Sequence, residues 1–135
     1  MIYLDSCAMV KLLIEEPESN ALDSHLAQQN HAGVHAISSQ LSITEVHRAL
    51  IRHGADETIH DEADAMLAAY ATLPLEPILE SAGRLPQPAL RSLDALHLAT
   101  ARMLGPAVTQ FITYDKRLVT AATELGLPVV TPGIG

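Results

Sequence analysis

Several residue types are scarce in this chain of 135 residues. It has no tryptophan, three tyrosines, one phenylalanine and a single cysteine, Cys7. One cysteine excludes an internal disulfide and favours a reducing compartment, so we expect a cytoplasmic protein. No uncharged stretch approaches the roughly 20 apolar residues of a membrane-spanning helix. Asp5 and Lys11 follow Met1 so closely that a signal peptide is not expected either.

Basic residues are also few. Eight Lys and Arg stand against 16 Asp and Glu, which gives a net charge of −8. This balance argues against an extended basic groove for nucleic acid, because phosphates are bound by Lys and Arg. The objection weakens if several acids are metal ligands, since bound divalent cations offset their charge locally. The composition is therefore compatible with an enzyme that binds phosphates through metal ions.

Aliphatic residues must form the core, since apolar residues make up 48% of the chain and aromatic residues only 3%. The length fits a single domain over residues 1–135, because two domains would each bury too little. Short apolar runs, expected as strands, alternate with amphipathic segments, expected as helices. Strands are expected at residues 1–4, 34–37, 75–78, 108–114 and 129–131. Helices are expected at residues 7–15, 17–29, 41–53, 57–73, 92–104 and 115–125.

This alternation indicates an α/β fold in which a parallel sheet is covered by helices on both faces. Residues 41–73, which are rich in helix, resemble an inserted helical hairpin. The apolar faces of this segment and of the first two helices exceed what a small core needs. We therefore expect a homodimer and a hydrophobic groove for a partner.

Two acids follow predicted strands directly. Asp5 ends the first apolar run and Asp115 ends the run that contains Phe111 and Ile112. Open α/β sheets bind ligands at the carboxyl ends of their strands, which makes both acids candidate site residues. The alternative is a helix N-cap, because a helix follows each of them. Two such acids in one small sheet favour a shared site over two separate caps.

Asp94 and Glu45 are candidates for different reasons. Asp94 opens a helix that is apolar almost all round, so its burial would cost several kcal/mol without a partner. A stabilising first-turn acid is the alternative for Asp94, but we favour a bound cation. Glu45 lies on the flank of an apolar helix stripe, and alone it would be read as an exposed partner of Arg48 or Arg52. It gains weight only as the fourth member of the set.

Four carboxylates drawn together repel one another by about 3 kcal/mol per pair at 5 Å and an effective dielectric constant of 20. Mg²⁺ or Mn²⁺ relieves this repulsion, prefers oxygen ligands and keeps waters in its remaining positions. A metal-bound water is acidified and can attack a phosphodiester. Ser6 and Thr113 lie beside the strand-end acids and could orient waters or carboxylates, although ordinary capping explains them equally well.

The residues that carry these acids resemble a known family. The segments are MIYLDS at residues 1–6, the helix of Glu45, LRSLDALHLATA at residues 90–101 and FITYD at residues 111–115. Together they are similar, over the whole chain and with the acids in the same order, to the PIN-domain family and within it to the VapC toxins.

The resemblance implies a sheet of about five parallel strands and Mg²⁺/Mn²⁺-dependent endoribonuclease activity. It implies a homodimer and a toxin inhibited by a small VapB-type antitoxin. Asp5, Glu45, Asp94 and Asp115 carry over as catalytic and metal-binding residues.

Other residues and functions are less favoured. His25, His31, His35, His47, His53 and His60 lack a ligand-like spacing and are expected to be solvated. His97, three residues after Asp94, is expected to be a hydrogen-bonded core residue, and Cys7 a small apolar one. A phosphoryl-transfer enzyme of the haloacid-dehalogenase type would need an Asp at position 7, and a receiver domain would need adjacent acids. A PIN-fold module that binds RNA or a partner without hydrolysis remains the alternative function.

Overall fold

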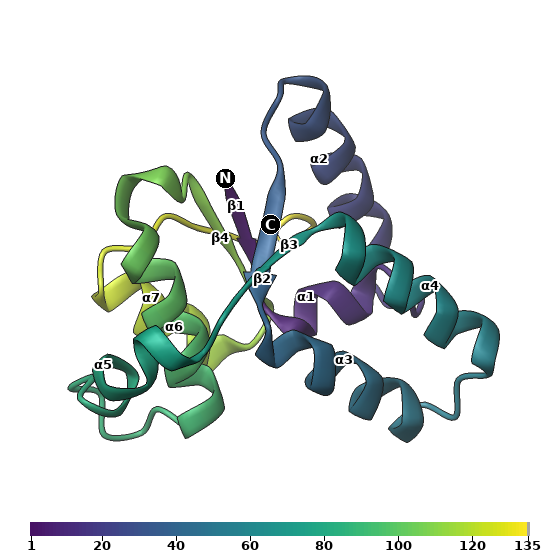
Figure 1. Ribbon diagram of the computed structural model, residues 1–135. Helices are drawn as coiled ribbons and strands as arrows, with labels where there is room; N and C mark the ends of the chain where they lie inside the picture. Colours follow the sequence, from purple (N-terminus) through teal and green to yellow (C-terminus); the bar gives the residue numbers. More distant parts are fainter. Residues whose placement is uncertain (135) are drawn as a thin grey trace.

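Five short parallel strands form the centre of the computed structural model (Figure 1), which describes residues 1–134. Residue 135, the last of the predicted single domain, lies outside the described residues. The order of the strands is β3-β2-β1-β4-β5, and every neighbouring pair is parallel. The strands are β1 Ile2–Leu4, β2 Ala36–Ser39, β3 Ala71–Leu73, β4 Gln110–Ile112 and β5 Val129–Val130.

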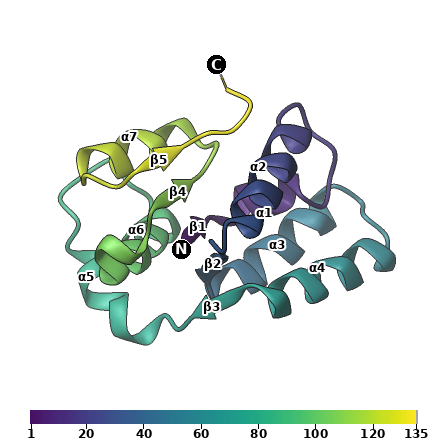
Figure 2. The same ribbon diagram turned by 90° about the horizontal axis from the view of Figure 1, so that it is seen from above.

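Helices cover both faces of this sheet, as Figure 2 shows from above. One layer consists of α1 Ser6–Lys11, α2 Ser19–His31, α3 Leu41–Arg52 and α4 Glu57–Ala69. The other consists of α5 Leu79–Gly83, α6 Ser92–Leu104 and α7 Lys116–Glu124, with the 3-10 turns η1 Glu76–Ile78 and η2 Gly105–Ala107. The predicted three-layer α/β/α fold is therefore confirmed. In this arrangement α3 and α4 pack together as a hairpin that joins β2 to β3.

The central strands are buried on both sides, and their side chains alternate between the two layers. Ile2 and Leu4 of β1 pack against α1 to α4, whereas Tyr3 between them packs against α6 and α7. Successive side chains of a strand point to opposite faces, so the three residues of β1 pack into the hydrophobic clusters on both faces of the sheet. This explains why the first strand is a continuous apolar run.

The third strand differs from the prediction. A helix was expected over residues 57–73 and a strand over residues 75–78, but α4 ends at Ala69 and β3 occupies Ala71–Leu73. Residues 76–78 form the turn η1 instead. A strand of three residues is too short to show an alternating pattern, and Ala71 has little strand preference of its own, so pairing with Ile37 and Ser38 of β2 decides the conformation.

Other boundaries were also misplaced by two or more residues. The first helix ends at Lys11, not near residue 15, and β2 and α2 each begin two residues later than expected. The strand expected over residues 108–114 is β4 Gln110–Ile112, so Thr113 follows the strand directly and does not lie within it.

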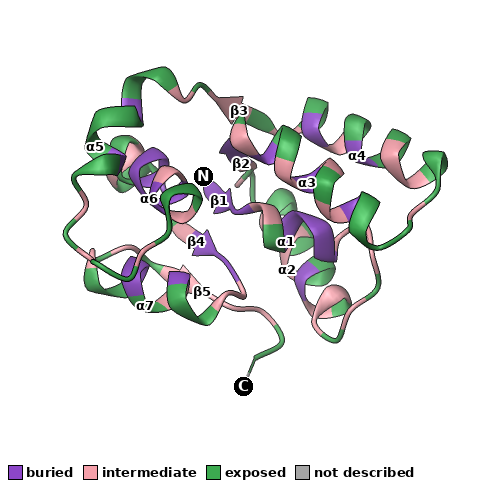
Figure 3. Ribbon diagram, turned by 90° about the horizontal axis from the view of Figure 1, so that it is seen from below, coloured by how far each residue is buried: buried purple, intermediate pink, exposed green. Residues whose placement is uncertain are grey.

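The chain order of the strands creates a topological switch point between β1 and β4. The chain builds β1, β2 and β3 outward and then returns to place β4 on the other side of β1. Loops that leave the carboxyl ends of β1 and β4 therefore diverge, to α1 on one side and to α7 on the other (Figure 3). Open sheets bind their ligands at such a point. Among the described residues, no helix combines the length and apolarity needed to cross a membrane.

Candidate active site

Asp5 lies at the switch point, where β1 ends and α1 begins. Its backbone is extended, and its carboxylate accepts a hydrogen bond of 2.8 Å from the backbone N–H of Ala8. Asp5 is thus an N-cap, as the alternative interpretation expected. Yet its side chain is only 3% exposed, and burial raises the pKa of Asp5 to about 6. Within residues 1–134 it forms no ion pair, so capping leaves a buried carboxyl without a cation.

Thr113 joins Asp5 to the end of β4. Its hydroxyl is fully buried and donates a hydrogen bond of 2.5 Å to the second carboxylate oxygen of Asp5. The same hydroxyl oxygen accepts from the backbone N–H of Asp115 at 3.2 Å. Thr113 therefore spans the gap between β1 and β4 and supports one acid directly and the other through its backbone. The hydrogen bond from Thr113 to Asp5 and the local one from the Asp115 N–H occur together, and the role of Thr113 beside a metal site stays a prediction.

Asp115 is the N-cap of α7. Its carboxylate accepts hydrogen bonds from the backbone N–H groups of Arg117 and Leu118, at 2.9 and 3.3 Å through one oxygen. The capping interpretation thus holds for Asp115 as well. Only one of its two oxygens is used, so capping leaves the other free for a ligand.

Asp94 lies in the first turn of α6, and its side chain is half-buried. Burial raises the pKa of Asp94 above its usual range, and the negative charge of Asp115 raises it further. Arg91 and His97 act in the opposite direction but do not reverse the shift. Asp94 is the one predicted acid that forms no side-chain hydrogen bond with any other described residue. A half-buried carboxyl without a hydrogen-bond partner is predisposed to bind a cation.

Glu45 projects from α3 toward α6. One of its carboxylate oxygens lies 2.7 Å from Nε2 of His97, which is a buried side chain on α6. Its predicted alternative, a surface pair with Arg48 or Arg52, does not form among residues 1–134. His97 thus connects the helix of Glu45 to the helix of Asp94.

Two hydrogen bonds together fix which nitrogen of His97 carries the proton. The Tyr3 hydroxyl lies 2.8 Å from Nδ1 of His97. The Glu45 carboxylate can only accept, so Nε2 of His97 carries a proton and donates to Glu45. Nδ1 of a neutral His97 then accepts from the Tyr3 hydroxyl, which keeps its proton because burial and the charge of Asp5 raise the pKa of Tyr3. Tyr3, His97 and Glu45 form a directional chain from β1 through α6 to α3.

The four acids act on one another electrostatically. The charge of Glu45 raises the pKa of both Asp5 and Asp94, as the charge of Asp115 raises that of Asp94. Nevertheless, in residues 1–134 no three His, Cys, Asp or Glu side chains converge closely enough to form a metal-binding group as they stand. Glu45 is held by His97 and Asp115 by its cap, so joint coordination requires rotation of these side chains.

The remaining predictions have mixed outcomes. Ser6 forms no side-chain hydrogen bond with the described residues and lines the hollow between α1 and α3. His97 is the hydrogen-bonded core residue that was expected, but the sequence analysis did not identify Tyr3 as its partner. The only sequence signal was the helical spacing that puts His97 on the same face as Asp94.

Cys7 is exposed and lines the hollow between α1 and α3, whereas the other histidines lie away from the acids. Partial burial of the thiol and the charge of Asp5 raise the pKa of Cys7 to about 12, so the thiol is a poor nucleophile at neutral pH.

His25, His47 and His60 are not simply solvated, as was expected. The ring nitrogens of His47 lie 2.7 Å from Nδ1 of His60 and 2.8 Å from Asp64, and these contacts tie α3 to α4. Nε2 of His25 lies 2.6 Å from the side-chain oxygen of Gln110 and ties α2 to β4.

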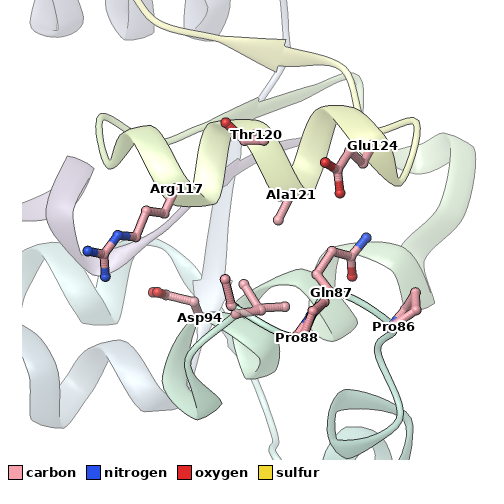
Figure 4. A pocket seen from close by; sticks show the side chains of 10 residues that line it. Pro86, Gln87, Pro88, Asp94, Arg117, Thr120, Ala121 and Glu124 are labelled. Atoms are coloured by element: carbon pink, nitrogen blue, oxygen red, sulfur yellow. The ribbon is translucent and has the colours of Figure 1, made fainter.

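Two hollows each reach one of the four acids. One, of about 580 Å³, runs between α1 and α3 and includes Ser6 and Glu45. The other, of about 460 Å³, lies between α7 and the loop before α6. Figure 4 shows Asp94 and Arg117 at one end of this second hollow, with Glu124 and Pro86 at the other. Glu45 therefore borders one hollow and Asp94 the other, an arrangement that suits an extended substrate.

Comparison with known proteins places this geometry in context. The family model for the PIN domain matches residues 2–124. The chain is 39% identical over 134 residues to ribonuclease VapC47 of Mycobacterium tuberculosis, with 98% of both chains covered. It is 42% identical over 132 residues to ribonuclease VapC46 of the same species, with 97% of both covered.

Solved structures share the fold at lower identity. Mycobacterium tuberculosis VapC20, described as a sarcin-ricin loop cleaving toxin, matches with a TM-score of 0.73 and 16% identity. That match covers 90% of this chain and 95% of VapC20. FitAB bound to a DNA fragment matches with a TM-score of 0.71 and 16% identity, over 100% of this chain and 97% of the other.

Proposed function

The chain belongs to the PIN-domain family, among its VapC-type toxin endoribonucleases, and from this premise we propose that Asp5, Glu45, Asp94 and Asp115 form its active centre. The observation that carries the assignment is the state of Asp5. It is buried at the switch point, its pKa is raised to about 6, and no basic side chain of the described residues pairs with it. A buried carboxylate of this kind needs a cation.

The four residues fit Mg²⁺ or Mn²⁺. All are carboxylates, which suit hard cations, and no thiolate or histidine pair among them favours zinc. His97 contacts the set but points its N–H at Glu45, which makes it a support for a ligand. When bound, such a cation acidifies a water for attack on a phosphodiester and stabilises charge on the leaving oxygen.

Each protein group has a distinct part in this proposal. Asp5 and Asp94 are the buried and half-buried ligands whose raised pKa values reflect unmet negative charge. Thr113 fixes one oxygen of Asp5 and so orients its carboxylate. His97, itself oriented by Tyr3, fixes one oxygen of Glu45 and leaves the other for a ligand or a water. Asp115 keeps one oxygen free of its cap. Ser6 lies beside Asp5 and is a further candidate to orient water.

The partners follow from the toxin assignment. We propose a VapB-type antitoxin as the inhibitor and a homodimer as the assembly. Support comes from an apolar hollow of about 710 Å³ between α2, α4 and the amino ends of β1 and β2. Exposed apolar side chains on α3 and α6 offer further contact area; they are Ile43, Ile51, Leu93 and Met103.

End-group analysis of a cleaved oligoribonucleotide tests the mechanism. Hydrolysis should require divalent metal, stop in EDTA and return with Mg²⁺ or Mn²⁺ but not with Ca²⁺, whose looser coordination positions the attacking water poorly. Attack by water should leave a 5′-phosphate and a 3′-hydroxyl, and should survive a 2′-deoxy substitution at the cut site. Asp5→Asn and Asp94→Asn should abolish it.

Several outcomes would overturn this mechanism. Cleavage that persists in EDTA, or that stops when only the 2′-hydroxyl at the cut is missing, excludes metal-assisted attack by water. Full activity in Asp5→Asn and Asp94→Asn excludes the assigned centre. Pure protein that binds RNA but never cleaves it would be the non-hydrolytic PIN-fold module instead.

A further inference from the structure

The few basic side chains of this acidic protein are not evenly distributed. Of eight Lys and Arg, Lys11 is paired with Glu18 and Arg84 with Glu80. The other six form no ion pair within residues 1–134. Five of these six lie on elements that lead to the proposed active centre; they are Arg48, Arg52, Arg91, Lys116 and Arg117. Only Arg102 lies elsewhere, at the far end of α6.

Arg48 and Arg52 line the hollow between α1 and α3 together with Glu45. They follow Glu45 on α3 by one and two turns, so Arg52 lies about 10 Å along the helix from it. Both side chains are exposed. The other acid of this hollow, Glu16, lies 4.0 Å from Lys11 and is partly neutralised. The hollow therefore carries free positive charge that leads away from the active centre.

Basic residues mark the opposite side as well. Lys116 and Arg117 directly follow Asp115 at the start of α7, and Arg91 is the N-cap residue of α6, three positions before Asp94. All three side chains are exposed. Arg117 lines the second hollow at the same end as Asp94 (Figure 4). Positive charge thus flanks the acids on both sides of the switch point.

We propose that these five side chains form a binding track for the phosphate backbone of a single RNA strand, which crosses the carboxyl edge of the sheet from the α3 hollow to the α7 hollow. The inference rests on the proposed ribonuclease function and adds the residues that hold the substrate. Free Arg and Lys side chains on both sides of an acidic centre complement a polyanion whose reacting phosphate lies at the acids. A single strand can bend into both hollows, whereas a duplex holds its phosphates on a rigid cylinder.

The five side chains of the track should contact mainly the phosphates of the RNA. Among the described residues, neither hollow is lined by Tyr or Phe, and His53 is the one aromatic ring in the hollow between α1 and α3. The five Arg and Lys side chains therefore offer more contacts to phosphates than the hollows offer to bases. Tyr3 and Phe111 are fully buried against each other, and the Tyr114 hydroxyl donates to Pro132. Binding dominated by phosphate contacts depends on counterion release, so it should be strongly sensitive to salt.

Fluorescence anisotropy of a short labelled single-stranded oligoribonucleotide, in EDTA to prevent cleavage, tests this track. Five phosphate contacts predict that log affinity falls with log salt with a slope of about −3.5. Arg48→Gln/Arg52→Gln should flatten the slope by about 1.4 and weaken binding roughly tenfold or more at low salt. Lys116→Gln/Arg117→Gln should do the same from the other side. Arg84→Gln/Arg102→Gln, with the same change in net charge, should leave both quantities unchanged.

The outcomes separate this track from the activity itself. Unchanged slopes in both site variants, or an equal loss in the control, would overturn the track, even if metal-dependent cleavage is found. That result would leave these side chains to a protein partner. Tighter binding of a duplex of the same sequence would also overturn it. RNA binding that depends on Arg48 and Arg52, without cleavage in any divalent metal, would retain the track and refute the hydrolytic function.

Discussion

At Asp5, desolvation of a buried carboxyl opposes the hydrogen bonds that favour its ionised form. Asp5 caps α1, accepts a hydrogen bond from Thr113 and is almost completely buried. Two hydrogen bonds favour the ionised form, but desolvation outweighs them and raises the pKa of Asp5 to about 6. A residue chosen only for stability would not carry a buried charge at this position. A buried carboxyl with a raised pKa is characteristic of a functional site.

This conflict predicts a pH-dependent effect of Asp5→Asn on metal-free protein. The pKa of Asp5 in the folded state, about 6, lies above the value near 4 of an unfolded chain. Protonated Asp5 therefore costs the wild type no stability below pH 4. As the pH rises through 6, ionisation of the buried carboxyl lowers the free energy of unfolding. Asn has no charge to bury and keeps the cap. The free energy of unfolding of Asp5→Asn should thus equal that of the wild type near pH 4 and exceed it by up to about 3 kcal/mol at pH 7.

Urea unfolding in EDTA at several pH values measures this difference. Asp61→Asn, an exposed change on α4, provides the matched control and should stay within about 0.5 kcal/mol of the wild type throughout. A variant less stable than the wild type at pH 7 would show that Asp5 is mainly structural.

Three elements of the fold meet in the chain of Tyr3, His97 and Glu45. Tyr3 comes from β1, His97 from α6 and Glu45 from α3, and the two contacts measure 2.8 and 2.7 Å. The Tyr3 ring also stacks on Phe111 of β4 at 5.3 Å. The orientation of a site carboxylate therefore depends on how a strand and two helices pack.

Tyr3→Phe should loosen this orientation without disturbing the core. The ring keeps its stacking, but Nδ1 of His97 loses a buried donor, at a cost of about 1–3 kcal/mol in unfolding free energy. Long-range ¹⁵N–¹H spectra of His97 should show the Nε2–H tautomer in the wild type and a mixture in Tyr3→Phe. Tyr114→Phe, which removes a hydroxyl bonded to Pro132, should leave the tautomer unchanged. An Nδ1–H tautomer in the wild type would refute the direction of the chain.

The sequence predicted some of these elements and contacts and missed others for physical reasons. Asp5 and Asp115 could be identified because a short apolar run followed by an acid and a helix is a local pattern. The strand Ala71–Leu73 was missed because three residues directly after a helix show no alternating pattern, and only pairing with β2 makes them a strand. The partners of His97 lie 94 and 52 residues away in the chain. Only packing brings them together.

At the scale of the whole molecule, charge is sorted by region. Acids dominate α4, which carries Glu57, Asp61, Glu62 and Asp64 but no Lys or Arg. Most free basic residues instead surround the proposed active centre. The net charge of −8 therefore says little about the potential that a substrate meets at the carboxyl edge of the sheet.

Metal should stabilise the whole fold, because the four acids are brought near one another only in the native state. Their mutual effects on the pKa values of Asp5 and Asp94 show that the folded site bears repulsion which the unfolded chain lacks. A cation that binds the native state alone stabilises it by about 2.7 kcal/mol at a hundred times its Kd. For a domain of this size, this corresponds to a rise in Tm of roughly 10 °C.

Thermal melts with increasing Mn²⁺, at constant ionic strength, measure this coupling. The wild type should show a saturable rise in Tm that EDTA reverses, and Asp5→Asn and Asp94→Asn should each lose most of it. Asp61→Asn should retain the full rise, because α4 carries no proposed ligand. A rise of the same size in Asp94→Asn would place the cation away from the proposed centre. A wild type without any rise would mean that the four carboxylates do not converge on a metal, and that burial alone raises the pKa of Asp5.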